Sequence, residues 1–122
     1  MSGEDPDWIT DLVEDVGDDL RVAAEYDKTG YVSRYVRPDL QEEYTTDDLD
    51  EIRQEMIVLM LGKDRLEEFL DAGGFNALTY WLDDAIVYHF PETEAFYGRV
   101  VSVEPAAESL RETVFEHSSE KP

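Results

Sequence analysis

The chain has 122 residues, of which 42% are hydrophobic, so one domain with a buried core is expected and a disordered acidic tail is excluded. Its 31 acidic and 10 basic residues give a net charge of -21, which excludes a basic phosphate-binding surface and therefore a role in binding nucleic acid. The absence of cysteine excludes disulfides, thiolate metal sites and a cysteine nucleophile.

The acidic residues are spread along the whole sequence and do not form one block, which is typical of a solvated surface. Such a surface repels itself at low ionic strength, whereas in about 1 M salt the Debye length falls to about 3 Å and the repulsion is screened. We therefore expect a protein from a salt-accumulating cytoplasm, as in halophilic archaea. The N-terminus has no signal-peptide pattern and no apolar run approaches the ~18 residues of a membrane span, which predicts a soluble cytoplasmic protein with no membrane contact.

Residues 1–5 are predicted to be a disordered tail, and a helix follows in the stretch DPDWITDLVEDVG. Asp5 can cap this helix, Pro6 suits its first position and Gly17 ends it. The apolar residues form one face of the helix through their spacing of three and four: Trp8, Ile9, Leu12, Val13, Val16 and Leu20.

Residues 20–37 alternate between apolar and polar side chains around the turn DKTG, which predicts a β-hairpin. If Asp27 pairs with Tyr31, Ala24 faces Arg34 and Val22 faces Val36. Arg34 then lies on an apolar face, while Tyr31, Tyr35 and Arg37 lie on the opposite face. Two interpretations are open: Arg34 forms a structural ion pair, or Tyr31, Arg34, Tyr35 and Arg37 form a site for an anion or a partner protein.

The longest helical segment begins at Thr45 or Thr46, and Gly62 is expected to break it. Its apolar residues predict a core stripe: Leu49, Ile52, Met56, Leu59 and Met60. A second helix is expected to run through Leu66, Phe69 and Leu70 and to stop at Gly73–Gly74.

Three strands are predicted next, in NALTYWL, AIVYHF and FYGRVVSV, and all three are apolar on both faces, as in a sheet covered by helices on both sides. A last helix begins at Pro105 and has Ala106, Leu110 and Val114 on one face. Residues 117–122 are predicted to be a second disordered tail. The expected fold is a single α+β domain over residues 6–116, with the order α-β-β-α-β-β-β-α and a five-stranded antiparallel sheet.

This order of elements resembles the roadblock (dynein light chain) superfamily and its longin and profilin-like relatives. The resemblance implies that the long middle helix covers one face of the sheet and the terminal helices the other. The stretches DLRVAAEYDKTGYVSRYVRPDL, LDAGGFNALTYWLDDAIVYHFP and GRVVSVEP are similar to small acidic uncharacterised proteins of haloarchaea. That similarity implies no activity and transfers no functional residue.

The stretch NALTYWL contains no ionised group in a chain of which 34% is charged. In a roadblock-like sheet this strand lies at an edge, and an uncharged edge can pair with another chain. The sequence therefore predicts a homodimer that pairs through Leu78, Thr79, Tyr80 and Trp81. The alternative is that the loop DLQEEY covers this edge.

No catalytic, metal-binding or cofactor-binding motif is found. His89 lies within a strand and His117 in the predicted tail, the serines lie outside nucleophile motifs, and DDLDE lacks the spacing of an EF-hand. The leading hypothesis is a non-enzymatic dimeric adaptor or regulatory module that serves a small GTPase or a signalling protein. The alternative is a PAS-like ligand-sensing domain, with its pocket between the sheet and the middle helix. A cavity above roughly 300 Å³ with a few polar groups would favour the sensor, and an exposed uncharged edge over a dry core would favour the adaptor.

Overall fold

A computed structural model of the chain describes residues 6–43, 46–92 and 97–118. The elements are α1 (Asp7–Val16), β1 (Leu20–Asp27), β2 (Gly30–Val36), α2 (Thr46–Leu61), α3 (Lys63–Leu70), β3 (Leu78–Trp81), β4 (Ile86–Glu92), β5 (Tyr97–Val103) and α4 (Arg111–Ser118), with short 3-10 segments η1 (Gly17–Asp19), η2 (Pro38–Leu40) and η4 (Pro105–Leu110). This succession confirms the predicted α+β class and the predicted order of elements.

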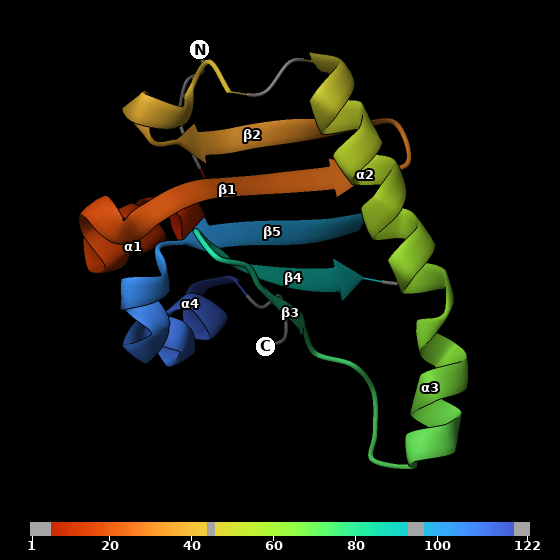
Figure 1. The fold of residues 1–122 in the computed structure, drawn as a ribbon. Coiled ribbons are helices and arrows are strands. Elements are labelled where there is room, and N and C mark those ends of the chain that lie inside the picture. Colours follow the sequence, from red (N-terminus) through yellow and green to blue (C-terminus); the bar gives the residue numbers. More distant parts are fainter. Residues whose placement is uncertain (1–5, 44–45, 93–96, 119–122) are drawn as a thin grey trace.

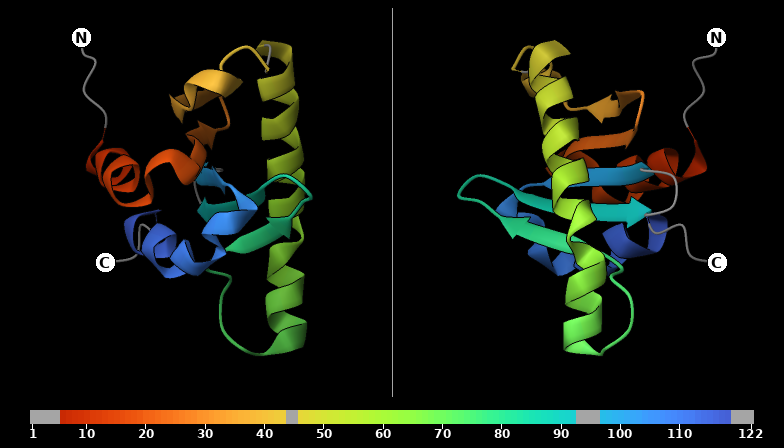
Figure 2. Two further views of the ribbon diagram at one scale, coloured as in Figure 1. Left: turned by 60° about the vertical axis from the view of Figure 1, so that its left-hand side comes forward. Right: turned by 90° about the vertical axis from the view of Figure 1, so that its right-hand side faces the viewer.

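The five strands form one antiparallel sheet in the order β2-β1-β5-β4-β3, so β2 and β3 are its two edges. Helices α1 and α4 lie side by side on one face, and α2 crosses the other face (Figures 1 and 2). Helices on both faces explain why β4 and β5 are apolar on both of their sides.

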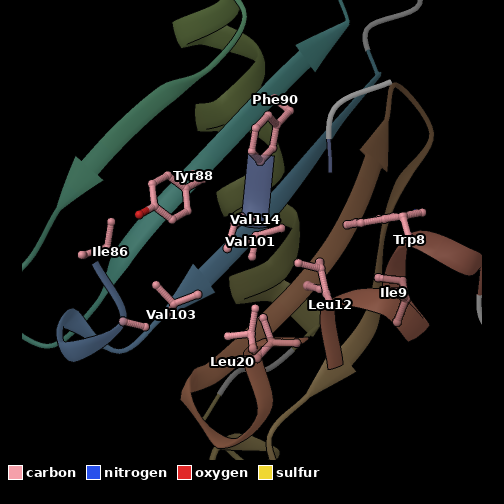
Figure 3. Packing of buried hydrophobic residues seen from close by; sticks show 13 residues of the cluster. Trp8, Ile9, Leu12, Leu20, Ile86, Tyr88, Phe90, Val101, Val103 and Val114 are labelled. Atoms are coloured by element: carbon pink, nitrogen blue, oxygen red, sulfur yellow. The ribbon is translucent and has the colours of Figure 1, made fainter. Parts of the chain in front are cut away.

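The main hydrophobic core lies between the sheet and the pair α1 and α4, as Figure 3 shows. The spacing of apolar residues predicted the buried side of α1, where Trp8, Ile9, Leu12 and Val16 are buried. Val13, which the same spacing placed beside them, is exposed instead. Gly17 ends the helix with a φ of 67°, which favours glycine. Pro6 occupies the N-cap position, and the proposed cap Asp5 lies outside the described residues.

The predicted register of the hairpin is wrong near its turn. Asp27 pairs with Gly30 and not with Tyr31, because its carboxylate accepts hydrogen bonds from the N–H groups of Thr29 (2.7 Å) and Gly30 (3.0 Å) and closes a tighter turn. The register then shifts between Ala23 and Ala24, and from there Val22 faces Val36 as predicted. The extra residue of this bulge is Arg34, so it does not face Ala24 within an apolar row.

The middle helix ends at Leu61 and a second helix begins at Lys63, on either side of Gly62 as the sequence predicts. The predicted core stripe of α2 is only half-buried at Leu49, Ile52 and Met56, and the side chains of Leu59 and Met60 lie outside the described residues. Helix α3 extends past the β3 edge of the sheet (Figure 1), so none of the five described strands lies beneath it.

Two boundaries differ from the sequence prediction. Pro91 belongs to β4, where it pairs with Gly98 on β5. It lies beyond His89, the last residue of β4 that pairs with β3, so only one side of β4 has a neighbouring strand at this position. Helix α4 continues to Ser118, which is buried, so the folded part of the domain extends beyond the expected residue 116.

Candidate functional site

The four residues of the predicted hairpin site do not form one surface. Tyr31 lines a cavity on the α2 face, whereas Tyr35 packs against the hydrophobic core on the opposite face. Arg34 donates to Glu25 (Nε to Oε2, 2.6 Å) at the surface of the hairpin. The geometry therefore favours the ion-pair interpretation of Arg34 over a shared binding site.

Arg37 belongs to a separate ion-pair network at the other end of the hairpin. It donates to Asp39 (2.6 Å) and lies 2.9 Å from Glu104, which also accepts a hydrogen bond from Arg21 at 2.9 Å. The hydrogen bond from Arg21, together with that from Arg37, lowers the pKa of Glu104. Two arginines are thus matched by two carboxylates in this network.

A polar pair lies buried in the sheet face below α2. Tyr26 on β1 and His89 on β4 are joined by a 2.5 Å hydrogen bond between Oη and Nε2, across the intervening strand β5. The tyrosine ring lies directly over Gly98, which leaves the necessary space because it has no side chain. Burial lowers the pKa of His89 to about 4, so it is neutral at pH 7, and burial also raises the pKa of Tyr26. His89 is fully buried and does not line the cavity on the α2 face.

The β3 edge carries the residues that the sequence singled out for dimerisation. Among the described strands β3 pairs only with β4, and Trp81 next to its turn is 60% exposed. Further large apolar side chains are exposed on the neighbouring segments of the chain: Val58, Leu61, Leu66, Phe69, Leu70 and Leu82. The described part of the loop DLQEEY follows β2 instead, where Gln41 donates to the carbonyl of Val36 at 3.3 Å. The alternative that this loop covers β3 is therefore wrong for residues 39–43; Tyr44 lies outside the described residues.

The opposite edge strand, β2, is protected in two ways that β3 lacks. It contains the bulge at Arg34, and the guanidinium of that residue is itself exposed at the surface. Bulges and charged side chains both oppose edge-to-edge pairing. The two edges of the sheet are consequently not equivalent, and β3 is the one suited to pairing.

A cavity of about 650 Å³ lies beside α2 on the same face of the sheet. Its floor is a row of directly paired residues that runs across four strands: Val36, Val22, Ser102 and Val87. Ile52 and Met56 of α2 form one wall, and the β3–β4 turn with Asp83 and Asp84 forms part of the rim. The sequence analysis did not identify Ser33 and Ser102 as lining residues. Ser102 could have been noticed, because it is a polar residue within the valine-rich strand β5.

These features define a small α+β domain with one unprotected sheet edge and a cavity beside a helix that is only partly buried. The chain belongs to a protein family described as a domain of unknown function (DUF7522), whose model matches residues 8–120. No curated protein and no solved structure matches the chain, so no residue role comes from a relative.

Two further findings apply to the described part of the chain. None of its helices is long and apolar enough to cross a bilayer. Within the same residues, histidine and carboxylate side chains form no group of three suited to holding a metal ion.

Proposed function

We propose that the protein is a non-enzymatic homodimeric module of a halophilic cytoplasm, which acts as an adaptor or regulator after two copies pair through β3. The observation that carries this proposal is the β3 edge, with its unprotected backbone and exposed Trp81. The order of the strands and the placement of the helices support the roadblock-like interpretation. By that resemblance, the client is a small GTPase or another signalling protein.

Pairing of the backbone alone would not hold two copies together, because β3 has only four residues. The exposed apolar side chains of α3 supply the additional surface, with Phe69 71% exposed. Since α3 projects beyond the β3 edge (Figure 1), a two-fold axis through that edge would bring its exposed side chains near the partner. Burial of each such side chain contributes about 1.5–3 kcal/mol.

Lys63, at the start of α3, is the single buried residue of this helix. The ammonium of Lys63 lies 3.0 Å from Glu67 Oε2, and the same oxygen accepts the N–H of Phe75 at 2.5 Å. These contacts tie the loop at Phe75 back to α3, so the first part of the connection from α3 to β3 is held against the helix.

The oligomeric state tests this proposal. Light scattering in molar potassium chloride should give about twice the chain mass of 14.0 kDa. Trp81→Glu places a charge on the edge and should yield a folded monomer. Val32→Glu is the matched control, because it adds the same charge at a 49% exposed apolar position of the other edge strand and should leave the dimer intact. An unaltered protein that is monomeric at micromolar concentration, or a dimer that only Val32→Glu disrupts, contradicts pairing through β3.

A second candidate function is ligand sensing, and the cavity on the α2 face favours it. Its volume of about 650 Å³ lies within the range of ligand pockets, which is about 300–1,000 Å³. The two functions are compatible, because one chain builds the cavity and the dimer uses the edge of the sheet.

A further inference from the structure

The cavity exists because α2 covers only part of its face of the sheet. Arg53 anchors the helix near the hairpin turn, where its Nη1 lies 3.4 Å from the carbonyl oxygen of Lys28. The part of the sheet face that carries Val22, Val87 and Ser102 is left beside the helix and open to the cavity. No described side chain of α2 is fully buried, so the helix lacks the packing that a filled cavity would provide.

The lining is mainly apolar, with a few polar groups that point to a ligand and not to a dry core. Ser102 lies in the floor between Val22 and Val87, its direct neighbours on β1 and β4. Ser33 lines the same cavity from β2. Within the described chain neither serine hydroxyl has a hydrogen-bond partner, so both are available to a polar group of a bound molecule.

The charged residues around the cavity indicate which charge the polar group of a ligand carries. Arg21 is the only arginine or lysine of the described lining, and Glu104 already holds its guanidinium at 2.9 Å. On the β3–β4 turn, Asp83 and Asp84 are exposed and have no cationic partner in the described part of the chain. A carboxylate or phosphate would thus meet uncompensated negative charge, whereas a protonated amine would meet two carboxylates.

We propose that this cavity binds a small hydrophobic amine, with its apolar body on the valine floor and against Ile52 and Met56, and its ammonium group toward Asp83 and Asp84. The inference rests on the ligand-binding candidate above and does not depend on dimerisation. Binding fills the space between α2 and the sheet, so the ligand stabilises the folded state in proportion to its concentration relative to Kd.

Three matched probes test the charge preference: 3-phenylpropylamine, 3-phenylpropan-1-ol and 3-phenylpropanoate, each titrated into the full chain and followed by amide chemical shifts. We expect saturable shifts at Val22, Val87 and Ser102 with affinity in the order amine, alcohol, carboxylate. The double variant Asp83→Asn/Asp84→Asn should weaken amine binding about two- to fivefold, the change that corresponds to a surface ion pair, and leave alcohol binding unchanged.

Two controls separate the possible failures. Ser102→Phe fills the cavity and should abolish binding of all three probes, whereas Val32→Phe, on the hairpin outside the cavity, should not. If the carboxylate binds as well as the amine, the assigned ligand class is wrong while ligand binding stands. Absence of saturable binding for all three probes, or shifts confined to another face, overturns the site itself. Repeating the titration with the Trp81→Glu variant shows whether binding is independent of the dimer.

Discussion

The contact between Tyr26, His89 and Gly98 makes a sharp prediction for the variant Gly98→Ala. A Cβ atom at residue 98 would lie 2.5 Å from the hydroxyl oxygen of Tyr26 and 2.6 Å from its ring carbons. Such separations do not occur between non-bonded atoms, so the ring must move. The ring is buried on strand β1, so its displacement disturbs the surrounding packing and breaks the hydrogen bond to His89.

Two costs add for this variant. Insertion of one methyl group into a packed region costs about 1–3 kcal/mol. Loss of the hydrogen bond leaves a buried imidazole nitrogen without a partner, which costs about 1–3 kcal/mol. Together they predict a loss of about 2–6 kcal/mol in the free energy of unfolding, a large part of the roughly 5–15 kcal/mol typical of a domain.

Urea denaturation in molar potassium chloride, followed by tryptophan fluorescence, measures the loss. Gly62→Ala is the matched control, since a Cβ atom there meets nothing within 4 Å and the residue has an ordinary φ of -89°. That control should stay within about 0.5 kcal/mol of the unaltered protein or become slightly more stable. Tyr26→Phe keeps the ring and removes only the hydrogen bond, so it should show the second cost alone. If Gly98→Ala unfolds at the same urea concentration as Gly62→Ala, the close packing of Tyr26 on β5 is refuted.

Three other outcomes are expected. Because the folded state holds the pKa of His89 at about 4, below its usual 6.5, the unfolded state binds the proton first as the pH falls. The free energy of unfolding should therefore fall by up to about 3 kcal/mol between pH 6.5 and pH 4, measured as the difference from His89→Gln. Equal pH dependence in both proteins would contradict this. Arg34→Ala should cost less than about 1 kcal/mol in a thermal melt, because the side chain is 37% exposed and its pair with Glu25 is a surface pair; a cost of several kcal/mol would indicate a buried role. The net charge of -21 predicts that Tm rises steeply from low salt to molar potassium chloride, and a flat Tm over this range would argue against adaptation to high salt.

The periodicity of the sequence predicted which elements form and in which order. The spacing of Trp8, Ile9, Leu12 and Val16 identified the buried side of α1, and Gly17 and Gly62 marked the helix ends. The absence of ionised residues distinguished NALTYWL from the rest of the chain. These features depend on residues close together in the chain, so local pattern and conformational preference suffice to predict them.

The hairpin register required the structure, because the choice lay between two turns that differ by one residue. Asp27 closes the tighter turn with hydrogen bonds to Thr29 and Gly30, and the bulge at Arg34 absorbs the difference. The pattern of apolar and polar residues does not predict which of the two turns forms. It follows from the geometry of one side chain.

Only the tertiary structure decided how α2 sits on the sheet and what lies beneath it. The sequence shows a helix with an apolar stripe, but how deeply Ile52 and Met56 are buried depends on Val22, Val87 and Ser102, which come from three different strands. In the same way, the bond from Tyr26 to His89 joins residues 63 positions apart and requires Gly98 on the strand between them. Contacts of this kind arise from the packing of distant segments in three dimensions, and the cavity is the space that this packing leaves unfilled.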